Sequence, residues 1–494
     1  MIDNQTTIFE MIYPTYKITK PIRLIEFFAG YGSQALALKY LNVPFEHWKI
    51  CEWAAKSIQA YKDIHFEEDT KDYSKGIEIG QIKEFLLNKG ISSNYNEPMS
   101  KEQINRLNED NARIIYNNIQ TTNNLVNIQQ VKGKDLEIVD TDKYDYILTY
   151  SFPCQDLSLA GKGKGMSDTS TRSGLLWEVE RILTECHELG TMPQILLMEN
   201  VPQVHGADNV EDFNKWQLRL EKLGYKNYWQ DLIATDYGIP QTRNRTFMVS
   251  ILGDYNYTFP KPIPLKLKLK DMLEDNVDEK YYLSDKMLNG MINTNFNSYK
   301  LENRLQDLNN SCDTLLTSTG SRCPHCIPIK NATKKGYLEA TDGDGIDISS
   351  RMEYHRGTVQ KGKTQTLSTM GGENNGVCVG TYQYSKSDNF MKRKDRLQLG
   401  KETSDTLQTT PKEGVVNSDL RIRKLTPKEC FRLMGVKDED YEKCAKNQSD
   451  SSLYHLAGDS IVTNCLCAIF KNLIEKEVEW NEILWKTNNR KNRT

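Results

Sequence analysis

Residues 23–52 constrain the fold of this chain more than any other segment, because they alternate a strand, a turn with two glycines, a helix and a second strand. Apolar runs cover residues 22–28 and 48–52. Between them lie the glycine turn at residues 29–32 and a helical stretch at residues 33–39. Such a βαβ unit requires a parallel sheet with helices on its faces.

Three further apolar runs have the length of buried strands. They lie at residues 146–149, 194–198 and 246–250. Strands separated by segments long enough for helices are typical of α/β domains. We therefore predict an α/β fold with a doubly wound, Rossmann-like parallel sheet over residues 20–255. In such a sheet, ligands bind beyond the carboxyl ends of the strands.

Two segments interrupt this rhythm. Residues 66–133 are polar, with surface helices expected at 82–87 and 104–119, and we interpret them as an insertion between sheet strands. After the proline-spaced linker at 260–264, short β-like pieces rich in Thr, Gly and Asn continue to about residue 420. A polar-Thr-Leu-x-Thr pattern recurs in this region, which favours a second, smaller and mostly β domain, although coincidence in a Thr-rich segment is the alternative.

The composition is that of a soluble protein, with 38% hydrophobic and 27% charged residues. Lys and Arg total 64 and Asp and Glu total 67, so the net charge of −3 excludes a uniformly basic coat protein but not a local basic cleft. The sequence has no apolar run of about 18 residues and begins without a basic-then-apolar signal. Its eleven scattered cysteines suit a reducing compartment, so we expect a cytoplasmic protein with no membrane association.

The turn after the first strand has the features of a nucleoside-cofactor site. Gly30 and Gly32 let the backbone approach a ligand closely, and Phe28 precedes them at the strand end. Glu52 follows about 20 residues later, where nucleoside-binding folds hydrogen-bond a ribose hydroxyl. Trp53 offers a flat face for an adenine ring. Because glycine turns alone are common, the glutamate and the tryptophan carry this interpretation.

A cysteine follows the strand at residues 146–149, at the sheet edge where α/β proteins place their ligands. Pro153 stiffens the backbone before Cys154, and glycines alternate with lysines at residues 161–165. Such a loop can close on a polyanion. A lone cysteine is more often buried and structural. Next to a basic loop, Cys154 is better interpreted as a nucleophile.

Two further motifs complete a candidate catalytic set. Glu199 ends an apolar strand, where a partly buried carboxyl group has a raised pKa and can protonate a ring nitrogen; a solvated carboxylate is the alternative. Arg243 and Arg245 alternate at the entry to the next strand, so both guanidinium groups can reach one face. Such a pair suits a phosphate or a charged reaction centre.

The chain contains, in this order, the motifs Phe-Ala-Gly-x-Gly, Glu-Trp, Pro-Cys-Gln, Glu-Asn-Val and Gln-x-Arg-x-Arg. They resemble the motifs of DNA (cytosine-5) methyltransferases of the bacterial and phage type. The resemblance spans residues 23–255 and resumes at 423–430 and 457–461, without correspondence for the insertion or for a segment near 270–420. It implies a site-specific enzyme that transfers a methyl group from S-adenosylmethionine to carbon 5 of a flipped cytosine in duplex DNA, with S-adenosylhomocysteine as product.

The same resemblance implies roles for individual residues. Cys154 would be the nucleophile that forms a covalent intermediate, Glu199 the acid at ring nitrogen 3, and Arg243 and Arg245 supporting cations. The implied cofactor contacts are Phe28, Gly30, Gly32, Glu52, Trp53, Asp135, Pro153, Ser460 and Asp459, the last standing where many members carry Asn. The expected DNA contacts are Gln155, Lys162, Lys164, Gln241, Lys392, Arg393, Lys394 and Arg396, for the last four of which a solvated face is the alternative.

We expect residues 1–275 to form a catalytic and cofactor-binding domain, 276–440 a target-recognition domain, and 441–494 a segment that returns to the first domain. The resemblance implies a monomer that acts on the nucleoid of a bacterial or phage-infected cell. No fused endonuclease domain is visible, so a cognate restriction enzyme of a restriction-modification system would be a separate chain.

Three alternatives are open at this point. An RNA cytosine methyltransferase of the same fold would share the motifs, but the large variable region favours a DNA reader. A catalytically silent cofactor-binding module would not need the Cys154, Glu199 and arginine set. A zinc site is suggested by the knuckle-like spacing of Cys323, His325 and Cys326 after Cys312, but no second Cys/His pair of matching spacing follows, and we predict no metal.

Overall fold

The computed structural model describes two long stretches before residue 283, a C-terminal stretch, and short pieces between them. The described residues are 13–152, 173–282, 306, 310–315, 326–330, 345–347, 359–360, 375–377, 382–383, 413–414 and 420–474. By its internal contacts the chain divides into unit 1 (residues 1–275, 307–324 and 426–494) and unit 2 (residues 276–306 and 325–425).

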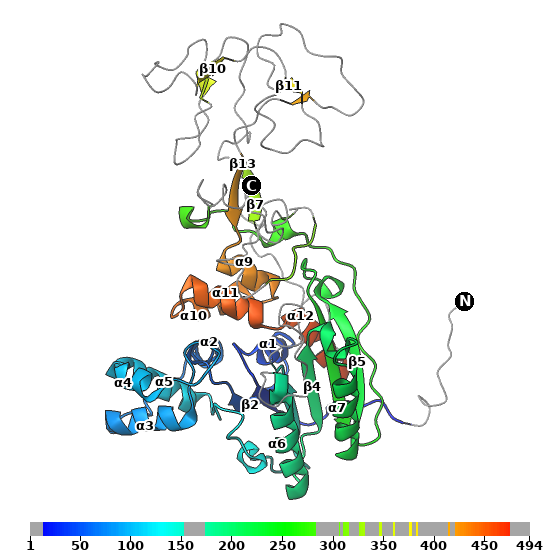
Figure 1. Cartoon of the computed structure of the whole chain (residues 1–494). Coiled ribbons are helices and arrows are strands. Elements are labelled where there is room, and N and C mark those ends of the chain that lie inside the picture. Colours follow the sequence, from blue (N-terminus) through cyan, green and yellow to red (C-terminus); the bar gives the residue numbers. More distant parts are fainter. Residues whose placement is uncertain are drawn as a thin grey trace, which may run out of the picture. The chain divides into compact units, whose positions relative to one another are not determined.

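Unit 1 is built on a six-stranded sheet with strand order β2-β1-β3-β4-β6-β5 (Figure 1). Its strands are β1 (Ile22–Phe27), β2 (Phe45–Cys51), β3 (Asp145–Tyr150), β4 (Ile195–Asn200), β5 (Tyr225–Ile233) and β6 (Asn244–Leu252). The first four strands in this order pair in parallel, and β6 runs antiparallel to both β4 and β5. The α/β prediction is confirmed, and its parallel sheet is extended by one antiparallel strand and by β5, which was not predicted.

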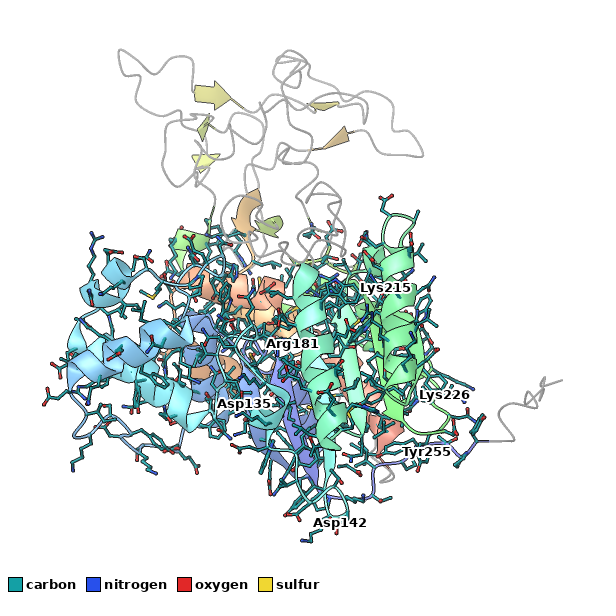
Figure 2. The ribbon with its side chains drawn as sticks, turned by 60° about the horizontal axis from the view of Figure 1, so that its bottom comes forward. Asp135, Asp142, Arg181, Lys215, Lys226 and Tyr255 are labelled. Atoms are coloured by element: carbon teal, nitrogen blue, oxygen red, sulfur yellow. The ribbon has the colours of Figure 1, made fainter. Side chains whose placement is uncertain are left out.

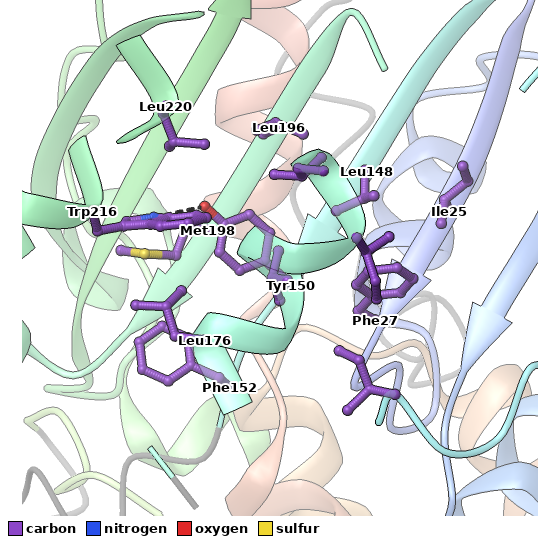
Figure 3. Packing of buried hydrophobic residues seen from close by; sticks show 14 of the residues in the cluster. Ile25, Phe27, Leu148, Tyr150, Phe152, Leu176, Leu196, Met198, Trp216 and Leu220 are labelled. Atoms are coloured by element: carbon purple, nitrogen blue, oxygen red, sulfur yellow. Dashed lines mark hydrogen bonds between the residues drawn. The ribbon is translucent and has the colours of Figure 1, made fainter. Parts of the chain in front are cut away.

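One face of the sheet is covered by α6 (Leu176–Leu189) and α7 (Val210–Lys222), whose apolar sides pack on alternate residues of β1, β3 and β4. Figure 3 shows this core, in which the Trp216 indole of α7 donates a hydrogen bond to the Tyr150 hydroxyl at 3.2 Å. Every second residue of the strands and one side of each helix are therefore buried together in one apolar layer.

The other face is covered by α1 (Ser33–Tyr40) and α12 (Thr463–Leu473), which pack against each other although they lie at opposite ends of the sequence. The Cys467 thiol of α12 approaches the Ala37 carbonyl of α1 at 3.7 Å. α2 (Ala55–His65) also lies on this face, where Tyr61 packs with Ile50 of β2. The C-terminal residues thus complete the core of unit 1.

The insertion contains α3 (Ile79–Lys89), α4 (Lys101–Arg106) and α5 (Glu109–Thr121). The helix expected over 104–119 is two helices, because the Asn108 side chain accepts the Asn111 N–H and caps a new helix. These helices were predicted to lie on the surface. They instead bury a core of their own that is closed by Ile58 of α2 and includes Ile82, Leu86, Ile104, Ala112 and Ile119.

Residues 426–474 form α9 (Pro427–Leu433), α10 (Asp438–Ala445), α11 (Asp450–Asp459) and α12. α9 starts with a capping box in which Thr426 and Glu429 hydrogen-bond each other's backbone N–H. Glu274, which follows the proline-spaced linker, is joined to this turn, because its N–H donates to the Glu429 carboxylate at 2.9 Å. Residues 426–440 therefore belong to unit 1, whereas the expected target-recognition domain extended to residue 440.

The described parts of unit 2 include short antiparallel pairings: β7 (Cys326–Lys330) with β13 (Leu420–Lys424), β8 (Gly345–Asp347) with β9 (Val359–Gln360) and β10 (Asn375–Val377), and β11 (Tyr382–Gln383) with β12 (Glu413–Gly414). Of the three polar-Thr-Leu-x-Thr repeats, the first lies in unit 1, and the other two, at residues 365–369 and 405–409, lie outside the described residues.

Among the described residues, no single helix has the length and apolar character needed to cross a membrane. The bent pair of α11 and α12 reaches that length and character jointly. In the same part of the chain, no group of three or more His, Cys, Asp or Glu side chains is arranged to hold a metal ion.

Candidate functional site

A cavity of about 930 Å³ in unit 1 opens where β1, β2, β3 and β4 end. Predicted site residues from five separate segments line it together: Phe28, Gly30, Glu52, Trp53, Glu199, Arg243, Arg245, Asp459 and Ser460. Residues that are more than 400 positions apart in the sequence thus share one cavity, as expected for the carboxyl edge of an α/β sheet.

The turn between β1 and α1 is left-handed at three positions: Phe28, Gly30 and Gly32 have φ angles of 58°, 56° and 83°. Gly32 does not line the cavity, but it has no room for a side chain, because a Cβ there would lie 2.4 Å from the His65 ring and 2.6 Å from the Tyr61 ring. The turn therefore requires glycine at this position.

The Glu52 carboxylate is fixed by backbone donors at the edge of the cavity. Its two oxygens accept the N–H groups of Gly30 at 3.0 Å and Ala54 at 2.8 Å. Burial outweighs these hydrogen bonds and raises the pKa of Glu52 to about 7. Asn124 fixes the backbone of the same residue, because it accepts the Glu52 N–H at 3.1 Å and donates to the Glu52 carbonyl at 2.9 Å.

Asp135 is not brought to this cavity. It lies in a short 3-10 turn, Gly133–Leu136, where its carboxylate accepts the Lys132 N–H at 2.9 Å (labelled in Figure 2). The cavity wall instead contains Asn127 and Ile128, which sequence analysis missed. The resemblance matched Asp135-Leu136 to an Asp-Ile pair of the family, but Asn127-Ile128, which follows α5 and still lies within residues 66–133, was the available signal.

Glu199 and Arg245 form an ion pair at the cavity, with 3.1 Å between Arg245 Nε and a Glu199 carboxylate oxygen. Glu199 is the penultimate residue of β4, and its side chain is only 10% exposed. Burial raises the pKa of Glu199, while the guanidinium groups of Arg245 and Arg243 act against that shift. A carboxyl group in this setting keeps its proton to a higher pH than an exposed one and can give it to a ring nitrogen.

Arg243 reaches the same cavity but is held by backbone carbonyls. Its guanidinium group donates to the Leu315 carbonyl at 3.1 Å and to the Ser460 carbonyl at 2.7 Å. The side chain is 4% exposed, so its charge is largely withdrawn from solvent. Arg243 therefore positions the segments at residues 315 and 460, whereas Arg245 faces the carboxyl group.

Gln241 is fully buried and cannot contact DNA in this structure, contrary to its predicted role. Its amide donates to the Leu433 carbonyl at 2.7 Å, and its side-chain oxygen accepts the Leu315 N–H at 3.0 Å. A glutamine with both ends used inside the protein is a structural connector. Sequence spacing alone does not separate this use of an amide from a surface contact.

The C-terminal end of α11 contributes Asp459 and Ser460 to the cavity. The Ser460 hydroxyl donates to the Leu456 carbonyl at 2.5 Å, which leaves its oxygen lone pairs as acceptors. Asp459 is exposed and presents a carboxylate where the resemblance led us to expect an amide.

Several predicted site residues lie outside the described residues: Pro153, Cys154, Gln155, Lys162, Lys164, Lys392, Arg393, Lys394 and Arg396. The described chain before them ends with Ser151 and Phe152, and both line the cavity. Cys312 is buried and its backbone pairs with that of Gln241, whereas the side chains of Cys323 and Cys326 are not described.

Comparison with known proteins gives concordant results. A family model described as C-5 cytosine-specific DNA methylase matches residues 89–475. The chain is 31% identical to the Type II methyltransferase M2.ScrFI of Lactococcus lactis subsp. cremoris over 460 residues, which cover 92% of this chain and 100% of the relative. It is 37% identical to the Orphan methyltransferase M.SssI of Spiroplasma monobiae over 287 residues, 57% of this chain and 71% of the relative.

Among solved structures, the Entamoeba histolytica methyltransferase EhMeth superposes with a TM-score of 0.51 at 14% identity, covering 92% of this chain and 98% of that one. A Spodoptera frugiperda DNMT2 mutant also gives a TM-score of 0.51, at 15% identity, covering 91% and 99%. At this level of identity, the two superpositions indicate a shared fold.

Proposed function

The chain belongs to the C-5 cytosine-specific DNA methylases, and we propose that its 930 Å³ cavity is the site where cytosine is methylated. It is a DNA (cytosine-5-)-methyltransferase, which transfers a methyl group to carbon 5 of cytosine in DNA. The observation that carries the site assignment is the meeting of Glu52, Glu199 and Arg245 in one cavity at the carboxyl ends of the strands.

The residues present fit S-adenosylmethionine, the methyl donor that membership of a methyltransferase family implies. Glu52 holds both carboxylate oxygens in fixed positions, suited to accept hydrogen bonds from a ribose diol. Trp53 and Ile128 supply apolar surface for an adenine ring, and the Ser460 oxygen can accept from the amino acid part. When bound, this cofactor supplies a methyl group made electrophilic by its sulfonium sulfur.

The chemistry requires a nucleophile, because carbon 5 of cytosine does not attack a methyl group unaided. The Cys154 thiolate adds to carbon 6, and Glu199 gives a proton to nitrogen 3, so that electron density moves to carbon 5. Carbon 5 then takes the methyl group. Loss of the carbon 5 proton to a base, elimination of the thiolate and return of the nitrogen 3 proton to Glu199 restore the aromatic ring. Arg245 keeps Glu199 in place for the proton transfer.

The substrate of this reaction is a cytosine flipped out of duplex DNA, because a stacked base cannot receive the thiolate. Unit 2 is the target-recognition region, and the cationic cluster Lys392, Arg393, Lys394 and Arg396 contacts phosphate. Type II methyltransferases among the relatives support a partner endonuclease encoded as a separate chain. We propose that the enzyme acts as a monomer on the DNA of a bacterial or phage-infected cell.

The substrate class is tested by incubating the protein with labelled S-adenosylmethionine and either duplex DNA or tRNA. We expect label in duplex DNA alone, and bisulfite sequencing of DNA from expressing cells should show protected cytosines within one short motif. Label in tRNA with none in duplex DNA would contradict the assignment of DNA as substrate. Protected cytosines without a common motif would contradict site specificity.

Glu52 gives a prediction for cofactor binding. Glu52→Gln should raise the Kd for S-adenosylhomocysteine by roughly 10- to 150-fold, because a charge-assisted hydrogen bond contributes about 1.5–3 kcal/mol. The pKa of Glu52 is raised to about 7, so the carboxylate that accepts the ribose hydroxyls forms as the pH increases. Wild-type affinity should therefore rise between pH 6 and 8.

Calorimetric titration of both proteins across this pH range measures the effect. The variant should lack the part of the pH dependence that Glu52 causes, while any titration of the ligand itself remains in both proteins. Equal affinities at pH 8 in a folded variant would remove Glu52 from the site.

A further inference from the structure

The insertion between β2 and β3 reaches the same cavity as Glu52. Asn94, Tyr95, Asn96, Glu97 and Pro98 all line it, although they belong to a polar segment that the family motifs do not include. The loop between α3 and α4 is thus a wall of the cavity as well as a connection between two helices.

Backbone hydrogen bonds fix this loop to the chain directly after Glu52. Ser92 donates its N–H to the Trp53 carbonyl at 2.8 Å, and its own carbonyl accepts the Ala55 N–H at 2.9 Å. These two hydrogen bonds lie on either side of Ala54, so the backbone of the loop is paired with the backbone next to Glu52 and Trp53.

The loop is also closed on itself. The Asn94 side-chain oxygen accepts the N–H groups of Asn96 at 2.9 Å and Glu97 at 3.2 Å, which is an Asx-type turn. The Ser92 hydroxyl donates to the Glu97 carbonyl at 2.7 Å. This local bonding presents Tyr95 at the tip of the turn, with a left-handed φ of 65° that a tyrosine rarely adopts.

The Tyr95 ring packs against a residue of another element that lines the cavity. Its ring centroid lies 4.0 Å from that of His455, with 33° between the ring planes. His455 is on α11, one helical turn before Asp459, and it also lines the cavity. The Tyr95–His455 contact thus bridges the insertion and α11 beside the two cavity carboxylates of Glu52 and Asp459.

We propose that the loop at residues 94–98, and Tyr95 in particular, forms a wall of the cofactor cavity. This wall contacts bound S-adenosylmethionine or S-adenosylhomocysteine and slows its release. The inference rests on the proposed function, because it assigns the insertion a part in binding the methyl donor and its product. Tyr95 is a ligand-binding residue of this wall. It holds His455 and closes the side of the cavity between Glu52 and Asp459.

The test uses S-adenosylhomocysteine as the probe and the full chain without DNA. Tyr95→Ala should raise the Kd about tenfold, with the change mainly in a faster release rate measured by stopped flow. Tyr95→Phe keeps the ring and should stay within about twofold of the wild type. The matched control is Tyr116→Ala, since Tyr116 packs on Phe85 inside the insertion at 5.0 Å and does not line the cavity.

The outcomes separate the two levels of the account. Failure of the wild type to bind the probe would overturn the proposed cofactor site. If the wild type and Tyr95→Ala bind the probe with equal affinity, only the proposed role of the loop is overturned. An equal loss of affinity in Tyr116→Ala would also overturn that role, because it would indicate a general loosening of the insertion.

Hydrogen exchange of the wild type does not depend on the folding of any variant. The probe should slow exchange of the amides at residues 94–97, and unchanged exchange there would contradict the proposal.

Discussion

Glu199→Gln is expected to slow methyl transfer in a single turnover by about 10²- to 10⁴-fold, the usual contribution of a positioned general acid. Glutamine keeps the size of the side chain and a carbonyl acceptor for Arg245, but it carries no proton for nitrogen 3 of the ring. Affinity for DNA and for S-adenosylhomocysteine should change little, because neither depends on that proton.

The pH dependence of the rate gives a second readout for the same residue. Burial raises the pKa of Glu199, so the protonated form persists to a higher pH than in an ordinary carboxyl group. The rate that depends on this acid should fall as the pH rises through that pKa, and the glutamine variant should lack this limb. Glu178→Gln is the control, since Glu178 also pairs with an arginine, Arg181 at 2.8 Å, but does not line the cavity. A Glu199 variant that retains more than a tenth of the wild-type rate would exclude general acid catalysis by this residue.

Cys154→Ala should abolish detectable methylation, the largest effect expected for any single change. Alanine cannot add to carbon 6, and without that addition carbon 5 does not become nucleophilic. Binding to DNA should persist, because phosphate contacts supply most of the affinity. Cys186→Ala removes a sulfur from the core on α6 and should retain activity. Loss of activity in both variants would indicate a general effect on folding.

The strands that could be predicted are those whose own sequence contains a run of apolar residues. β1, β2, β3, β4 and β6 each contain a run of buried residues that the sequence displays directly. β5 was missed because it is an edge strand, Tyr-Lys-Asn-Tyr-Trp-Gln-Asp-Leu-Ile, in which polar pairs interrupt the apolar residues. The reversed direction of β6 could not be predicted, since strand direction is set by the partner and not by the residues of the strand itself.

The candidate site divides in a similar way. Glu52 and Glu199 could be placed because strand ends converge at one edge of a parallel sheet. Asp135 was wrongly placed because the insertion displaced the spacing on which its assignment depended. Gln241 was wrongly assigned to DNA because an amide inside the protein and one at a surface look alike in a sequence. Tyr95 could not be predicted, because its position depends on the tertiary packing of the insertion against α2 and α11.

Trapping with 5-fluorocytosine tests the central claim most directly, because it reports which atom of the protein bonds to the base. A duplex with this base at the target should form an adduct that survives denaturing electrophoresis, since fluorine cannot leave as a cation and the thioether is not eliminated. The adduct should require S-adenosylmethionine and map by mass spectrometry to the peptide that contains Cys154. It should be absent in Cys154→Ala. An adduct at another cysteine, or methylation that persists in Cys154→Ala, would contradict the account.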